Sequence, residues 1–153
     1  QRVSEAIGKE RTGIRISPYG VFNDMPLYDD TEELFFHLVS ELNTMGIAYI
    51  HMVDHESMGA PHIPDSIKET VRSNFNGIYI ASGGFDSLSA EREISNGHGD
   101  LVAFGKPFIA NPDLVERIKL GKPFAKSDPE THYAATKKGY TDYPTLGDTY
   151  ELI

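Results

Sequence analysis

Short apolar runs alternate along the chain with longer segments in which apolar residues recur at helical spacing. Four of the runs have the composition of strands, at 13–17, 47–53, 77–81 and 101–104. Each is followed by a segment with apolar residues at i, i+3 and i+4, which predicts a helix. One strand and helix recur about every 25–35 residues, the length of a βαβ unit. The alternation predicts an α/β fold with parallel strands and right-handed crossovers, either half of a (β/α)8 barrel or a small doubly wound sheet.

The expected helix ends follow from capping residues. A helix over about 30–45 carries an apolar stripe and ends at Gly46. A shorter helix begins near Pro64 and buries one face, and Ser87 is expected to cap the next one. Asn111 and Pro112 are expected to open a further helix, which Gly121 stops.

The first residues also show helical spacing, although the chain starts with Gln1 rather than Met. Val3, Ala6 and Ile7 precede Gly8, so the chain is expected to open inside a helix. This start is typical of a cut, split or permuted chain, and a processed natural terminus is the alternative.

Composition narrows the class of protein. The chain has 153 residues and 39% hydrophobic content, enough for one domain with a sizeable core. It has 14 Lys and Arg against 23 Asp and Glu, so it lacks the basic surface of a nucleic-acid-binding protein. With no cysteine, disulfides and thiol nucleophiles are excluded. No apolar run is long enough to span a membrane, and a cytoplasmic protein with no membrane partner is the expectation.

Two glycine-bearing turns follow the last two strands. Gly83 and Gly84 come after the third strand, while Gly105 and Lys106 come after the fourth. Glycine lets backbone N–H groups approach an anion, and a lysine adds a full positive charge. The last two strand-to-helix loops of a (β/α)8 barrel commonly form a phosphate site. The placement therefore favours a phosphate site, although plain tight turns and a solvated lysine are the alternatives.

Three extended motifs lie in one order over almost the whole chain, at 11–18, 103–114 and 139–144. With the strands between them, they resemble the Old Yellow Enzyme family, the FMN-dependent ene-reductases. The resemblance implies a (β/α)8 barrel of which this chain is the C-terminal half, strands five to eight and a tail. Residues 1–120 would form four βα units, and residues 121–153 would form the tail of the same domain.

The resemblance also implies which residues bind FMN. Arg15 resembles the arginine that contacts the flavin ring near N1 and O2, where a cation stabilises the charge of reduced flavin. Gly83, Gly84, Gly105 and Lys106 resemble the residues around the FMN phosphate. Lys106 departs from the family, which usually has arginine there, so the charge is kept but the bidentate geometry is lost.

Two further expectations concern single side chains. Tyr133 resembles the tail tyrosine that lines the substrate cavity, and this assignment rests on the resemblance alone. An arginine between Ile14 and Ile16 is expected to have a partner, because an unpaired buried charge is costly, and an interior salt bridge is the alternative role for Arg15.

The implied reaction is the reduction of an activated alkene, conjugated to a carbonyl or nitro group. NAD(P)H reduces FMN, and flavin N5 then passes hydride to the alkene. The family's catalytic residues belong to its N-terminal half, so none is expected here. The expected partner is the complementary half-barrel or a second copy, because four strands alone leave two unpaired edges. A non-catalytic flavin- or phosphate-binding module, designed or split, is the alternative, and a phosphate-handling isomerase or aldolase is a weaker one.

Six histidines raise the question of a metal site. His51 and His55 lie four residues apart, but a strand running into a loop does not place them on one helix face. His51 is expected to be satisfied by a neighbouring polar group, and His62 and His98 to lie in loops. No metal is expected.

Overall fold

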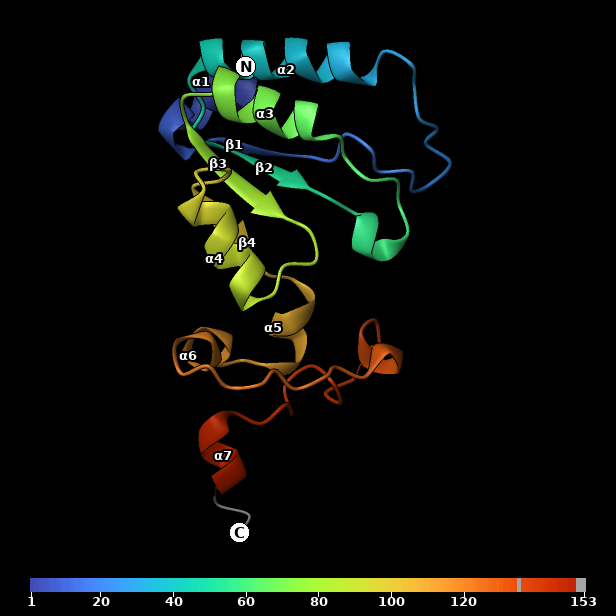
Figure 1. Cartoon of the computed structure of the whole chain (residues 1–153), viewed down its shortest axis with the longest axis vertical. Helices are drawn as coiled ribbons and strands as arrows, with labels where there is room; N and C mark the ends of the chain where they lie inside the picture. Colours follow the sequence, from blue (N-terminus) through green and yellow to red (C-terminus); the bar gives the residue numbers. More distant parts are fainter. Residues whose placement is uncertain (135, 151–153) are drawn as a thin grey trace. The chain divides into compact units, whose positions relative to one another are not determined.

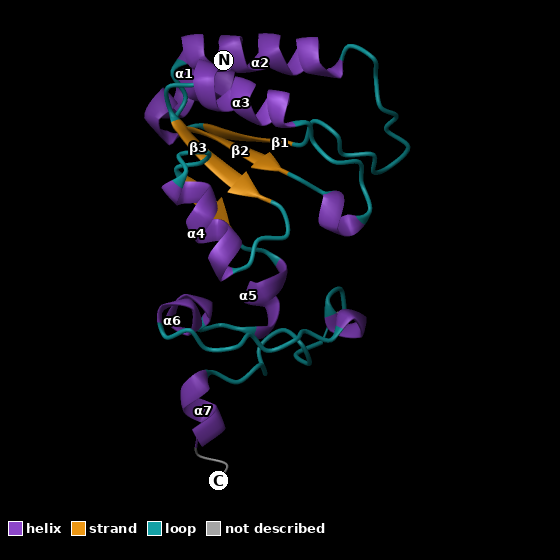
Figure 2. Ribbon diagram, in the orientation of Figure 1, coloured by secondary structure: helices purple, strands orange, loops and turns teal. Residues whose placement is uncertain are grey.

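The computed structural model describes residues 1–134 and 136–150, and the chain divides into two compact units, Gln1–Ala103 and Phe104–Ile153. The first unit contains a four-stranded parallel sheet in the order β1-β2-β3-β4 (Figure 2). The strands are β1 (Gly13–Ile16), β2 (Tyr49–Val53), β3 (Ile78–Ser82) and β4 (Leu101–Ala103). Each lies within two residues of its predicted position. The predicted α/β class with a parallel sheet is confirmed.

Helices of the first unit cover one side of this sheet, as α2 and α3 do in Figure 1. The helices of the first unit are α1 (Arg2–Ile7), α2 (Thr31–Met45), α3 (Asp65–Asn74) and α4 (Ser87–Ser95), and short 3-10 helices lie at Lys9–Arg11 and Glu56–Met58. α2 ends at Gly46, which adopts a left-handed conformation and donates its N–H to Leu42 and Asn43. The predicted helix over 30–45 is thus confirmed.

The core lies between these helices and the sheet. Val39 of α2 and Val71 of α3 are fully buried against Ile50 of β2, while Ile67 and Met52 are almost fully buried. Burying such a side chain contributes about 1.5–3 kcal/mol each. The apolar stripes that predicted the helices are therefore the surfaces that attach them to the sheet.

The strand register gives the sheet two different faces. Ile50 and Met52 point to the helices, so their neighbours Tyr49 and His51 point to the opposite face. Pairing of Arg15 with His51 and of Tyr49 with Ile78 places these residues together on that face. Tyr49 is 38% exposed, Ile78 46% and Leu101 of β4 50%. No helix of the first unit covers this apolar face within the described residues, and we call it the open face.

The second unit is built from short helices and a long irregular segment. Its helices are α5 (Lys106–Ala110), α6 (Leu114–Lys119) and α7 (Leu146–Tyr150), with a 3-10 helix at Pro129–Thr131. The side chain of buried Asn111 organises the segment that follows: it donates to the carbonyl of Ala125 (3.0 Å) and accepts from its N–H (2.8 Å).

Two predicted helix starts are wrong. α4 is capped by Asp86 rather than by Ser87, because the Asp86 carboxylate accepts from the N–H of Ser89 and the Ser89 hydroxyl bonds back to the Asp86 N–H. α6 begins at Leu114 rather than at Asn111, whose amide is committed to residue 125. Within the described residues, no helix is both long and apolar enough to cross a membrane.

Candidate functional site

Arg15 lies on the open face of the sheet, where its side chain is exposed. No ion pair or hydrogen bond joins its guanidinium to another residue in the described part of the chain. Within the described residues Arg15 is neither buried nor paired, so neither its expected partner nor the alternative interior salt bridge is found in this part of the chain. Its position leaves a full positive charge available to a group that docks on this face.

His51 pairs in register with Arg15 and has a polar atom without a partner. Its Nε2 is buried and makes no hydrogen bond, so the expectation of a satisfying neighbour is wrong. Burial first, and the nearby Arg15 charge second, lower the pKa of His51 below its usual value. The lowered pKa favours the neutral imidazole, whose buried Nε2 has no hydrogen-bond partner among the described residues.

His55 repeats this feature just beyond β2. Its Nδ1 is also buried without a partner, and its ring packs edge-on against Phe22 at a centroid distance of 4.8 Å. Two unsatisfied histidine nitrogens near the carboxyl end of β2 are unusual, because buried polar groups are nearly always hydrogen-bonded. His51 thus adds a buried unsatisfied nitrogen to the strand face that carries Arg15, and His55 adds another in the loop that follows.

Gly83 and Gly84 form the turn after β3, and the structure explains why both are glycines. Gly83 has a φ of +152°, and a Cβ there would lie 2.8 Å from the backbone oxygen of Asp54. Gly84 has a φ of +65°. Their N–H groups donate to no residue within the described ranges, which is the state required for binding an anion. These free donors fit a phosphate group.

The start of α4, which follows this turn, is a poorer place for an anion. The Asp86 carboxylate already accepts from the Ser89 N–H at 2.7 Å. Its negative charge opposes a second anion at the same helix end. Anion binding by the first unit is therefore best supported by the amides of Gly83 and Gly84.

Gly105 and Lys106 belong to the second unit, so their joint site with Gly83 and Gly84 stays a prediction. Gly105 precedes α5, and a Cβ added to it would meet no atom within 4 Å, so nothing in its surroundings requires glycine for steric reasons. The Lys106 side chain is exposed and makes no ion pair with any described residue. Both residues have room for a ligand group beside them.

Tyr133 lies in the tail just after the 3-10 helix at Pro129–Thr131, and it is 99% exposed. Exposure of an aromatic ring to water is unfavourable, and a substrate or another protein segment packed on the ring would remove that exposure. Its role in lining a substrate cavity stays a prediction.

Sequence reasoning missed one cluster that has metal-ligand chemistry. Ligand atoms of Asp54, Glu56 and His62 lie within 4.8 Å of one another. The groups already satisfy each other or a neighbour, since His62 Nδ1 lies 2.8 Å from Glu56 and Asp54 lies 3.3 Å from Lys68. We therefore assign no ion to it. The sequence signal was an Asp-x-Glu pair in a loop, which has no specificity by itself.

Comparison with known proteins gives consistent matches over nearly the whole chain. The family model described as NADH:flavin oxidoreductase / NADH oxidase family matches residues 1–124. A relative in Arabidopsis thaliana, 12-oxophytodienoate reductase 2, is 36% identical over 96% of this chain and 40% of its own length. The 12-oxophytodienoate reductase-like protein of Solanum lycopersicum is 33% identical over 95% of this chain and 39% of its own.

Solved structures agree with the sequence matches. Morphinone reductase superposes with a TM-score of 0.89 at 38% identity, over 97% of this chain and 40% of that chain. The old yellow enzyme from Trypanosoma cruzi superposes with a TM-score of 0.84 at 36% identity, over 94% of this chain and 37% of that one. The chain thus spans about 40% of the length of the relatives that it matches.

Proposed function

Because the chain belongs to the NADH:flavin oxidoreductase family, which contains the Old Yellow Enzymes, we propose that it is the flavin-binding part of an FMN-dependent ene-reductase. The observation that carries this proposal is the agreement of sequence and fold, with 38% identity and a TM-score of 0.89 to morphinone reductase. In this proposal β1 to β4 are strands five to eight of a (β/α)8 barrel, the C-terminal half. Two relatives are named as reductases, which supports reductive chemistry, and an activated alkene is the substrate class that we propose.

FMN, when bound, supplies the hydride chemistry, with NAD(P)H as the reductant. The residues of this chain would bind and orient it. The exposed guanidinium of Arg15 would hold the flavin ring by its charge. The free amides of Gly83 and Gly84, with Gly105 and Lys106, would bind the phosphate. Tyr133 would line the substrate cavity.

The open face supports the need for a partner. β1 and β4 are the edges of the sheet, and each lacks a neighbour on one side within the described part of the chain. Unpaired strand edges and exposed apolar side chains such as Ile78 and Leu101 are costly in water. We propose that the complementary N-terminal half-barrel covers them and supplies the catalytic residues. A second copy of this chain is the alternative cover.

The first experiment measures flavin binding. The chain is expressed alone and together with the N-terminal part of a homologous reductase, and released flavin is quantified after denaturation. We expect the pair to co-purify with FMN and to reduce an activated alkene with NAD(P)H. A complex that forms but takes up no FMN would refute the proposal, whereas an assembled flavoprotein that does not reduce alkenes would favour a non-catalytic module.

A second experiment assigns the phosphate residues by comparing FMN with riboflavin, which lacks the phosphate. Lys106→Ala should weaken FMN binding about tenfold and leave riboflavin almost unchanged, since one charge-assisted contact is lost. Lys122→Ala is the matched control, because Lys122 is also an exposed lysine of the second unit. Equal losses for the two flavins would contradict a phosphate contact.

The flavin-ring contact is tested in the same complex. Arg15→Ala should weaken both flavins and lower the reduction potential, because a cation near the ring favours the reduced, negatively charged form. Unchanged affinity and potential would contradict the assignment.

A further inference from the structure

A cavity of about 660 Å³ opens on the helix side of the sheet, lined only by residues of the first unit between Met52 and His98. This volume is in the range that holds a small organic molecule. Met52 and Ala81 contribute apolar surface from β2 and β3, and Phe85 adds an aromatic ring. Because these residues alternate with those of the open face, the cavity and Arg15 lie on opposite sides of the sheet.

The hydroxyl of Tyr79 is a polar group without a partner in this cavity. Tyr79 lines the cavity and is only 2% exposed. No described residue makes a hydrogen bond with its hydroxyl. Burial first, and then the charges of Glu93 and Asp54, raise the pKa of Tyr79 far above its usual value. The group is therefore a neutral hydroxyl beside two carboxylates, with an oxygen free to accept a hydrogen bond.

The charges around the cavity select the sign of a ligand. Five carboxylates line it, against Lys68 and Arg72. Arg72 makes an ion pair with Asp100 at 2.9 Å and donates a hydrogen bond to the carbonyl of Gly97, and neither partner lines the cavity. Lys68 makes an ion pair with Asp54 at 3.3 Å. Both cations are thus engaged, and negative charge is left in excess.

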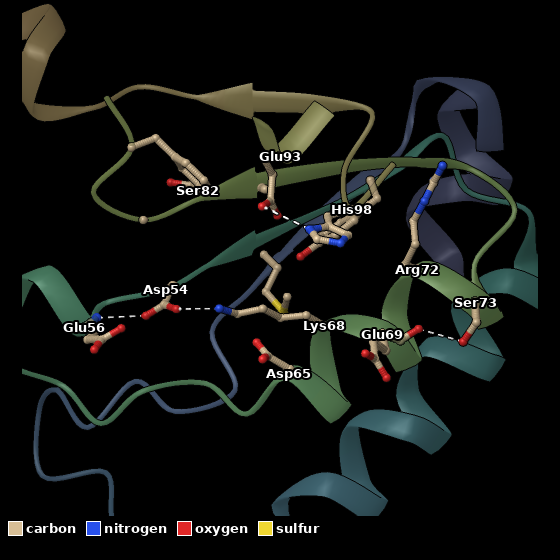
Figure 3. A pocket seen from close by; sticks show the side chains of 15 residues that line it. Asp54, Glu56, Asp65, Lys68, Glu69, Arg72, Ser73, Ser82, Glu93 and His98 are labelled. Carbon is tan, nitrogen blue, oxygen red and sulfur yellow. Dashed lines mark hydrogen bonds and ion pairs between the residues drawn. The ribbon is translucent and has the colours of Figure 1, made fainter. Parts of the chain in front are cut away.

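Among the carboxylates that line the cavity, Glu93 is largely buried and yet has few interactions that balance its charge. Its side chain is 20% exposed, and its ion-pair partner within the described residues is His98 at 3.7 Å. His98 is 65% exposed and its Nδ1 lies beyond hydrogen-bond distance, so this contact leaves the Glu93 carboxylate without a hydrogen bond from any described side chain. Figure 3 shows Glu93 joined to His98, and the Lys68 ammonium directed to Asp54.

We propose that this cavity binds an organic cation, a protonated amine on an apolar or aromatic body. The ammonium would donate to the Glu93 carboxylate and the Tyr79 hydroxyl, and the body would pack on Met52, Ala81 and Phe85. An anion is disfavoured by the excess of carboxylates, and a bare metal ion would leave the apolar surface and most of the volume unfilled. Aromatic rings add attraction for a cation.

The experiment uses three probes of nearly equal shape on the full chain. Phenethylammonium, 2-phenylethanol and phenylacetate differ in charge, and their binding is measured by calorimetry at pH 7. We expect the ammonium to bind about tenfold or more tightly than the alcohol, because the charge-assisted contact is lost in the alcohol. Phenylacetate should bind least. Equal affinity for the ammonium and the alcohol, or no binding of the ammonium at millimolar concentration, would overturn the proposal.

Two variants locate the site, and neither residue has a role in the proposed flavin chemistry. Glu93→Gln should remove the preference for the ammonium, whereas Glu91→Gln, on the exposed side of the same helix, should not. Tyr79→Phe should weaken the ammonium several-fold and leave the alcohol closer to its original affinity; Tyr140→Phe, on an 83% exposed residue, is its control. Far-UV circular dichroism checks that the variants fold. Folded variants that bind all probes as the unmodified chain does would contradict the assignment.

Discussion

Arg117 of α6 is expected to be the residue whose loss most weakens the second unit. Its side chain is only 7% exposed and makes an ion pair with Asp113 at 2.7 Å. It also donates to the carbonyl oxygens of Pro123 (3.1 Å) and Pro144 (3.3 Å). The other Asp113 oxygen accepts from the N–H of Leu146 at 2.7 Å. One pair therefore connects α6 to two distant parts of the tail.

The size of the effect follows from what Arg117→Met leaves behind. Methionine keeps most of the apolar stem, but the Asp113 carboxylate stays 14% exposed with one donor fewer, and two carbonyls lose their donor. Breaking a buried ion pair costs about 3–5 kcal/mol. Because Asp113 keeps the Leu146 amide, we expect the lower end, about 3 kcal/mol. Arg117→Lys should destabilise the second unit less, because lysine keeps the positive charge beside Asp113 but cannot also reach the carbonyls of Pro123 and Pro144 as arginine does.

The assay is hydrogen exchange by mass spectrometry on peptides that cover residues 120–147. A loss of about 3 kcal/mol corresponds to exchange roughly 100-fold faster where local opening limits exchange. Lys119→Met is the matched control, because Lys119 is an exposed residue on the same helix. A change in Arg117→Met no larger than that of the control would refute the reasoning. Unprotected amide exchange of the tail in the unmodified chain would also refute the reasoning.

The pH dependence of the same pair has a definite sign. Burial alone would raise the pKa of Asp113, but the hydrogen bonds from Arg117 and from the Leu146 amide outweigh it and lower the pKa. The pair thus contributes fully above the unfolded pKa of about 3.9, and its contribution is lost as the pH falls through the lower folded pKa. Exchange measured between pH 6 and 8 is therefore free of this titration.

Two further predictions concern local structure in the first unit. Asp86→Ala should fray α4, because it removes the acceptor for the Ser89 N–H. The pKa of Asp86 is lowered chiefly by that N–H, so in the unmodified chain the cap should be lost as the pH falls through the lowered pKa. Circular dichroism should show an acid-induced loss of helix in the unmodified chain and no such loss in the variant. Gly83→Ala should destabilise the first unit by about 1–3 kcal/mol in urea unfolding, because the new Cβ would meet Asp54 and the backbone would be strained. Gly105→Ala has open space around it and should change stability by less than about 0.5 kcal/mol, so equal effects of the two glycine variants would contradict the steric argument.

The order of strands and helices could be predicted from the sequence because each element has its own periodic pattern. The apolar stripe on α2 and the pair Ile67 and Val71 on α3 can be recognised from nearby residues alone, and these are the side chains that the structure buries against the sheet. The sequence does not predict α5, because Gly105 and Pro107 have the pattern of a turn, whereas proline is well tolerated in the first turn of a helix.

Features that depend on distant residues could not be predicted. The local pattern at Asn111 indicates a helix start, but its amide bonds to residue 125, and no local pattern indicates such a bond. The unsatisfied nitrogen of His51 likewise depends on which groups the sheet places beside it. Tyr79 has the pattern of an ordinary strand residue, and only packing reveals that it lines a cavity.

The alternation of residues along β2 places Arg15 and the cavity on opposite sides of the sheet, although Gly83 of the proposed phosphate turn also lines the cavity. His51 of β2 points to the open face beside Arg15, whereas its neighbour Met52 points to the helices and the cavity. A substitution such as Arg15→Ala therefore acts on one side of the sheet, and Tyr79→Phe acts on the other. If flavin binding fails while the ammonium probe still binds, the fold is intact and only the flavin assignment is lost. The converse result would remove the amine site and leave the family-based function in place.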